Sequence, residues 1–208
     1  MARAWMPEAE RLGADTTPAP AGIGAPRAVW TVTGSDPRAW SAREEALRML
    51  DGGRTSHLVW NPLTGEVAQT LAATRRGRLE LGCTRLNGVR LDHGHEGRVC
   101  LVVAVVASPE EPFTDGPMCG LEPILAWLDS WGIARVWPAG RPGTGSRTTE
   151  GGARLWARGG HFGHDQVPGS CSKGPGRLDT ARLLGRTPLT DETLLHSTPP
   201  RPRPSAIG

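Results

Sequence analysis

The sequence predicts a single α/β domain in which helices pack around a central mixed β-sheet. Segments rich in β-branched residues alternate with segments whose apolar residues recur at helical spacing. The longest apolar run, residues 99–107, is rich in valine and too short to span a membrane, which is typical of a central strand covered on both faces. The chain has 208 residues, 38% of them hydrophobic, which is enough for one domain with a core.

The first strand is predicted within residues 27–33, whose side chains alternate in polarity. Turn sequences flank this segment, Gly-Ala-Pro before it and Gly-Ser-Asp-Pro after it. Residues 56–71 contain two short apolar segments around an Asn-Pro-Leu-Thr-Gly turn, and we expect a hairpin there. The run over residues 99–107 should form the middle of the sheet.

Helices are predicted in three places. Ser41 and Glu44 have the spacing of a capping box, and the helix that they begin should end at Gly52. Its apolar face is expected to comprise Ala46, Leu47 and Leu50. A second helix over residues 121–131 should pack on the sheet, because its apolar residues recur every three or four positions. A short helix near residues 178–184 should complete the domain.

The remaining segments are expected to be irregular. Residues 137–160 are rich in Gly, Pro and Arg and predict a long surface loop. The domain should therefore cover residues 1–185, followed by a Pro-rich, disordered tail over residues 186–208.

Composition restricts the class of partner. The basic residues are almost all arginine, since Lys173 is the only lysine, and the net charge is +3. This balance argues against a nucleic-acid partner, which usually requires a concentrated basic patch. No apolar run is long enough for a membrane span, and the first residues carry charge where a secretory signal would be apolar. We therefore expect a protein without a membrane partner that is cytoplasmic as synthesised, with lysis or non-classical export as possible routes of release. We also expect a monomer. The four cysteines form no C-x-x-C pair, so no zinc ribbon is expected.

A motif near the end of the domain reads His-Phe-Gly-His-Asp-Gln-Val-Pro-Gly-Ser-Cys-Ser-Lys-Gly-Pro-Gly, residues 161–176. It resembles the C-terminal zinc motif of the type 2 N-acetylmuramoyl-L-alanine amidases, the family that includes phage endolysins and peptidoglycan-recognition proteins. Residues 56–69 look like the second strand and turn of that family, and residues 131–142 resemble a stretch of its actinobacterial members. The resemblance covers most of residues 1–185 and implies the amidase fold.

The resemblance also implies where a catalytic zinc would be bound. A zinc hydrolase needs three protein ligands and one open position for water. The positions that match the family's ligands hold Thr31, His164 and Gly174, so one ligand remains of three. The family's tyrosine helper matches His57, and its His or Lys helper matches Ser172. We therefore expect zinc to be absent or weakly bound.

Other metal or nucleophilic groupings remain open as alternatives. His161 and Cys171 flank His164 and could replace missing ligands. The simpler interpretation is that Cys171 is a turn residue and that His161 stands at the aromatic position of the family motif. His93 and His95 alternate in an Asp-His-Gly-His-Glu sequence, which is more simply a solvated loop. Thr33 with Asp36, or Ser170 with His164, could be written as a nucleophile and a base, but the spacing singles out no triad.

Tryptophan is the abundant aromatic residue, with eight copies beside two phenylalanines and no tyrosine. Indole rings can stack on sugars, and we expect Trp30, Trp60 and Trp156 to line a groove beside His164. Gln166 belongs to the same motif and is a further candidate for substrate binding.

The resemblance implies peptidoglycan or muropeptide as the ligand. The loss of zinc ligands favours recognition with little or no hydrolysis. An active amidase that cleaves the bond between N-acetylmuramic acid and L-alanine is the alternative. A phage-derived remnant that acts as an interaction protein is a third hypothesis.

Overall fold

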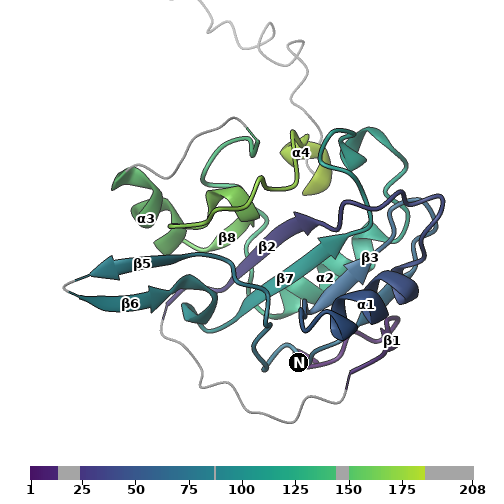
Figure 1. The fold of residues 1–208 in the computed structure, drawn as a ribbon, viewed down its shortest axis with the longest axis horizontal. Helices are drawn as coiled ribbons and strands as arrows, with labels where there is room; N and C mark the ends of the chain where they lie inside the picture. The colour runs from purple at the N-terminus through teal and green to yellow at the C-terminus, as the bar shows by residue number, and fades with distance from the viewer. Residues whose placement is uncertain (14–23, 87, 144–149, 186–208) are drawn as a thin grey trace, which may run out of the picture.

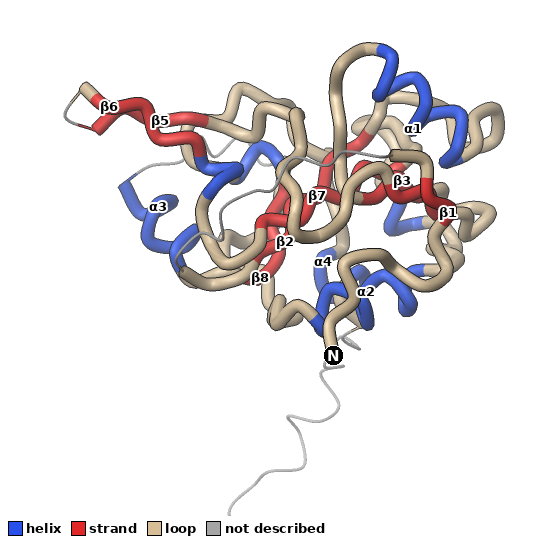
Figure 2. Tube along the Cα trace, turned by 90° about the horizontal axis from the view of Figure 1, so that it is seen from below, coloured by secondary structure: helices blue, strands red, loops and turns tan. Residues whose placement is uncertain are grey.

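The computed structural model describes residues 1–13, 24–86, 88–143 and 150–185, and the expected tail lies outside them. It shows an α/β fold with a mixed six-stranded sheet and helices on both faces (Figures 1 and 2). Across the sheet the strands are β1 (Glu10–Arg11), β4 (Val67–Gln69), β3 (Leu58–Trp60), β7 (Cys100–Val105), β2 (Arg27–Val32) and β8 (Gly160–Gly163). Only the hairpin pair β3 and β4 is antiparallel among these described strands.

The predicted central strand is confirmed, because β7 lies between β3 and β2 and pairs with both in parallel. The predicted hairpin is formed by β3 and β4, with Leu58 opposite Gln69. Both faces of β7 are covered, so five of its six residues are buried. This explains why its sequence is continuously apolar rather than alternating.

Helix α1 (Ala42–Asp51) begins with the predicted capping box, in which Ser41 and Glu44 bond reciprocally. The prediction of its buried face was wrong at Leu47, whose side chain is 43% exposed, while Leu50 is half-buried. Its buried residues are Ala42, Glu45, Ala46 and Met49. Small alanines face the sheet because the helix packs closely over Ala68 and Ala104.

The two faces of the sheet belong to different layers, as the view from below shows (Figure 2). On one face, Trp30, Trp60 and alternate residues of β7 pack with α2 (Leu121–Ser130) and α4 (Thr180–Leu183). The opposite face of β3 and β7 packs against α1. Next to it, Val29 and Val102 pack with Trp156, Phe162 and Val167.

Two elements depart from the sequence-based expectation. A second hairpin, β5 (Cys83–Leu86) with β6 (Val89–Asp92), extends from the body of the fold (Figure 1). Helix α3 (Glu150–Ala157) lies where only a long loop was predicted. Short 3₁₀ turns complete the described elements: η1 (His93–His95), η2 (Phe113–Asp115) and η3 (His164–Gln166). Within the described ranges, no helix is both long and apolar enough to cross a membrane.

Candidate functional site

Three positions that are distant in the sequence line one pocket of about 210 Å³: Thr31, His164 and Ser172. Thr31 is near the end of β2, His164 follows β8 directly, and Ser172 belongs to the loop beyond η3. The pocket lies on the α1 face of the sheet. Its other lining residues are Val32, Thr33, Arg48, Met49, Arg54, Leu79 and Ala104.

His164 is held in one orientation by its two ring nitrogens. Nε2 lies 3.0 Å from the carbonyl oxygens of both Glu80 and Leu81, so it carries the proton and donates. Nδ1 then carries the lone pair and accepts a hydrogen bond of 3.4 Å from the hydroxyl of Thr31. Burial lowers the pKa of His164 below its ordinary value, which favours this neutral form.

Gly174 offers no side chain and has little room for one. Its φ is +74°, in the left-handed region that favours glycine, and an added Cβ would lie 2.3 Å from Oδ1 of Asp165. The Asp165 carboxylate therefore occupies the space beside this position, where its Oδ2 accepts a hydrogen bond from the backbone N–H of Gly143. An aspartate at residue 174 would be strained at this φ and would require the Asp165 side chain to move.

The donor set of the pocket does not fit a zinc site. The Nε2–H of His164 is anchored to carbonyl oxygens, as is usual for a histidine that binds a metal. Yet Thr31 and Ser172 supply only neutral hydroxyls, and zinc in proteins is held by His, Cys, Asp or Glu. Among the described residues, no three such side chains lie together, and Cys171 is an exposed free thiol.

His57 has no ring nitrogen left to donate a proton to a ligand. Its Nδ1 accepts a hydrogen bond from the backbone N–H of Val102, and its Nε2 donates to the carbonyl of Arg75, both at 3.0 Å. Burial lowers its pKa to about 4, so the imidazole stays neutral. The side chain is 1% exposed and does not line the pocket. His57 is therefore structural, and the expectation that it assists catalysis is not met.

Gln166 also has internal partners for its polar atoms. Its Oε1 accepts from the indole N–H of Trp137 and from the backbone of Gly163, and its Nε2 donates to the carbonyl of Gly140. This amide fixes the loop before α3 to the end of β8. Gln166 thus positions the segment that carries His164 and leaves no polar atom for a ligand.

The three tryptophans expected in a groove are core residues. Trp30 and Trp60 have no exposed surface and Trp156 has 2%. Side chains alternate along a strand, so Trp30 points to the α2 face while its neighbour Thr31 points to the pocket. Each indole N–H donates inside the protein, for Trp30 to Nδ1 of His161. The groove prediction is wrong for these residues. The pleat of the sheet turns Trp30 and Trp60 toward the α2 face, and Trp156 packs against Phe162.

His93, which was expected in a solvated loop, is buried and belongs to a hydrogen-bonded network. Nδ1 of His93 lies 2.9 Å from Oε2 of Glu96, and its Nε2 lies 2.9 Å from the hydroxyl of Thr84. The same Glu96 oxygen accepts from Trp156, whose ring is stacked by Arg27. Thr84, His93 and Glu96 are thus linked at the hydrogen-bond distances found between a nucleophile, a base and an orienting acid. The network connects the second hairpin, through Thr84, to Trp156 of α3.

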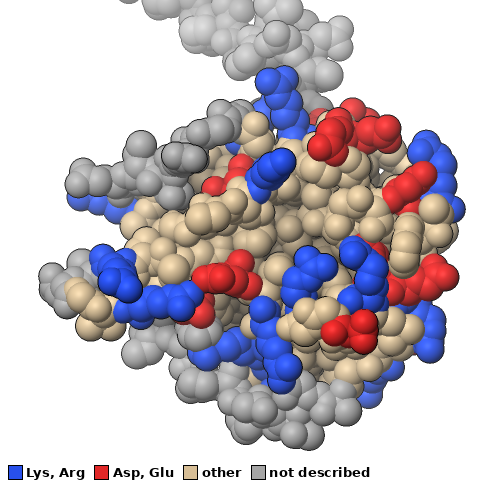
Figure 3. Space-filling model, viewed as in Figure 1, with Lys and Arg blue, Asp and Glu red and all other residues tan. Residues whose placement is uncertain are grey.

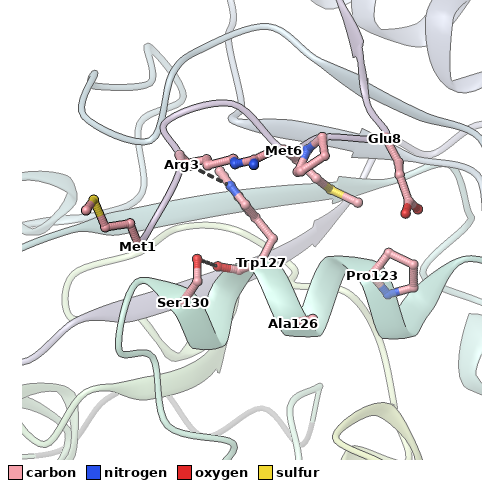
Figure 4. Close-up of a pocket in the computed structure, with 9 residues that line it drawn as sticks. Met1, Arg3, Met6, Glu8, Pro123, Ala126, Trp127 and Ser130 are labelled. Carbon is pink, nitrogen blue, oxygen red and sulfur yellow. Dashed lines mark hydrogen bonds between the residues drawn. The ribbon is translucent and has the colours of Figure 1, made fainter.

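A second pocket, of about 270 Å³, lies between the N-terminal segment and α2 (Figure 4). Figure 4 shows the Trp127 indole reaching from α2 to the carbonyl of Arg3, with Met6 and Pro123 beside it. Its walls are mainly apolar and contain no histidine or cysteine. It lacks the combination of polar groups that marks the first pocket.

The chain matches no protein-family model, and neither the curated proteins nor the solved structures include a significant match to it.

Proposed function

We propose that this chain is a degenerate member of the amidase and peptidoglycan-recognition family that binds peptidoglycan or muropeptide without hydrolysing it. The observation that carries this proposal is the convergence of Thr31, His164 and Ser172 on one pocket. The resemblance had assigned these positions to a common site from separate parts of the chain. The proposal includes the amidase fold, for which the mixed sheet and the helices on both faces are the support.

The pocket suits binding better than hydrolysis. Its polar groups are three hydroxyls, one neutral imidazole and two guanidinium groups, which can bond to the amide, hydroxyl and carboxyl groups of a glycopeptide. Amide hydrolysis needs an activated water and a group that stabilises the oxyanion. The donors at Thr31 and Ser172 cannot hold the metal that performs both tasks in the family.

The test is binding of the purified protein to insoluble peptidoglycan and to a soluble disaccharide-peptide, together with detection of newly released L-alanine amino groups. We expect binding and no release. Ser172→Trp would fill the pocket from its loop and should weaken binding by about tenfold or more. Lys173→Trp adds the same ring at the adjacent exposed residue and should leave binding nearly unchanged.

Release of amino groups by the unaltered protein would show an active amidase. Absence of binding to either material would overturn the proposal and favour the interaction-protein hypothesis. Equal binding by the Ser172 variant and the unaltered protein would exclude this pocket as the site.

A further inference from the structure

An exposed tryptophan lies beside the pocket, at a position that sequence reasoning passed over. Trp40 is 39% exposed, in contrast to the buried Trp30, Trp60, Trp127 and Trp156. Its backbone is nevertheless held on both sides, because its N–H donates to the carbonyl of Asp36 and its carbonyl accepts from the side chain of Asn61. A ring on a fixed backbone loses little conformational freedom when a ligand stacks on it.

Arg48 connects this ring to the pocket. Its guanidinium carbon lies 5.8 Å from the centre of the Trp40 ring, and the same side chain lines the pocket. The buried carboxylate of Glu45 holds Arg48 through Nε and Nη2. This pairing leaves Nη1 as a donor and keeps the guanidinium between the indole and the pocket.

The charge of the pocket is positive. Arg48 and Arg54 both line it, and no acidic side chain does. Arg54 is an exposed residue just beyond α1, and within the described part of the chain its guanidinium forms no ion pair. Figure 3 shows basic side chains over α1 with acidic ones nearby, so the positive character is local rather than spread over this face. A guanidinium with free donors is suited to bind a carboxylate through two parallel hydrogen bonds.

We propose that Trp40 stacks on a sugar ring of the ligand and that Arg54, assisted by Arg48, binds a carboxylate of the attached peptide. The ligand class is therefore an acidic glycopeptide, with the sugar outside the pocket over the indole and the acidic group inside it. This inference rests on the proposed function, since it takes the pocket as the ligand site. It adds two specificity-determining residues that the resemblance did not assign.

The experiment measures affinity by calorimetry for two soluble disaccharide-peptides, one with a free peptide carboxylate and one with that carboxylate amidated. Trp40→Ala should weaken binding of both by about tenfold, and Trp40→Phe by only about two- to threefold, because a smaller aromatic face remains. Arg54→Gln should weaken binding of the acidic ligand by about tenfold and leave the amidated ligand unaffected. Leu47→Ala removes an exposed apolar side chain from the neighbouring helix α1 and is the matched control.

The outcomes separate the two proposals. If Ser172→Trp abolishes binding while Trp40→Ala and Arg54→Gln bind both ligands like the unaltered protein, the pocket is the site and this inference is overturned. If Arg54→Gln weakens both ligands equally, carboxylate recognition by Arg54 is excluded. If the unaltered protein binds neither ligand nor insoluble peptidoglycan, the proposed function itself fails. If Ser172→Trp, Trp40→Ala and Arg54→Gln keep the melting temperature of the unaltered protein, their differences in affinity arise at the binding surface and not from unfolding.

Discussion

Three histidines, His57, His161 and His164, occupy buried positions, and in each the imidazole is kept neutral by burial. His57 and His164 bond through both ring nitrogens, which fixes the tautomer. His161 accepts from Trp30 at Nδ1, and no partner for its Nε2 is found in the described residues. A sequence motif marks such residues as chemically capable. Whether a nitrogen faces a ligand or a carbonyl depends on packing that the motif does not contain.

The stability of the protein should consequently fall in mild acid. The pKa of His57 is lowered from 6.5 to about 4 in the folded state, so between these values the unfolded chain binds more protons. The stabilisation is fully present above pH 6.5 and is lost as the pH falls through the folded pKa. The shift corresponds to about 3 kcal/mol.

We predict that in His57→Gln the fall in unfolding free energy between pH 7 and pH 4 becomes smaller by about 3 kcal/mol. Glutamine can keep one donor and one acceptor at this position, so the variant should still fold. Denaturant titrations at half-unit pH intervals measure the effect. The same pH dependence in both proteins would mean that His57 is not held neutral.

Among the helices and strands, the predictions from sequence were correct where the local sequence signal agrees with the packing of the element. The capping box of α1, the hairpin of β3 and β4, and the central strand β7 all carry strong local patterns. The buried face of α1 differs from the predicted one because the helix packs closely on the sheet, where small side chains fit between them. Neither hydrophobicity nor helical spacing alone distinguishes Ala42 and Met49 from Leu47.

The hairpin of β5 and β6 was missed although the Asn-Gly pair at residues 87–88 is a strong hairpin signal. The contacts that hold the hairpin to the body of the fold come from elsewhere in the chain. His93 and Glu96 join it to Trp156 of α3, across about a third of the chain length. Glu96 remains a carboxylate, since the hydrogen bond from His93 is the main cause that holds its pKa below its ordinary value. An interaction of such long range leaves no periodic signal in the sequence.

We predict that Glu96→Ala destabilises the protein by about 2 kcal/mol, because the Trp156 indole N–H and His93 both lose a partner. Hydrogen exchange should become faster in the amides of β5 and β6 than in those of β7. Glu80→Ala is the matched control, since it removes only the exposed ion pair with Arg90 and should cost about 0.5 kcal/mol or less. A smaller loss for Glu96→Ala than for Glu80→Ala would show that the network does not anchor the hairpin.

For the whole molecule, the order of the strands explains which sequence expectations about the site succeeded. Thr31 and His164 lie close together because β2 and β8 are parallel neighbours, and both residues are near the carboxyl ends of these strands. Motif order in a sequence can indicate such convergence. It could not indicate that Trp30 and Trp60 face the opposite layer, or that Asp165 fills the space beside Gly174, since these depend on pleat and loop packing.

The same geometry leads to a prediction for metal content. Under the proposed function, only His164 remains of the amidase ligand set, and one imidazole with two hydroxyls forms a weak site. A metal that binds only the folded state raises the unfolding free energy by RT ln(1 + [L]/Kd), so an ion whose Kd exceeds its concentration adds little. We expect well under one zinc per chain in the purified protein, and a chelator should leave the melting temperature nearly unchanged. Elemental analysis and thermal melts before and after chelation provide the measurement. One firmly held zinc per chain, with a clear drop in melting temperature on chelation, would mean that other side chains complete the site and would reopen the hydrolytic hypothesis.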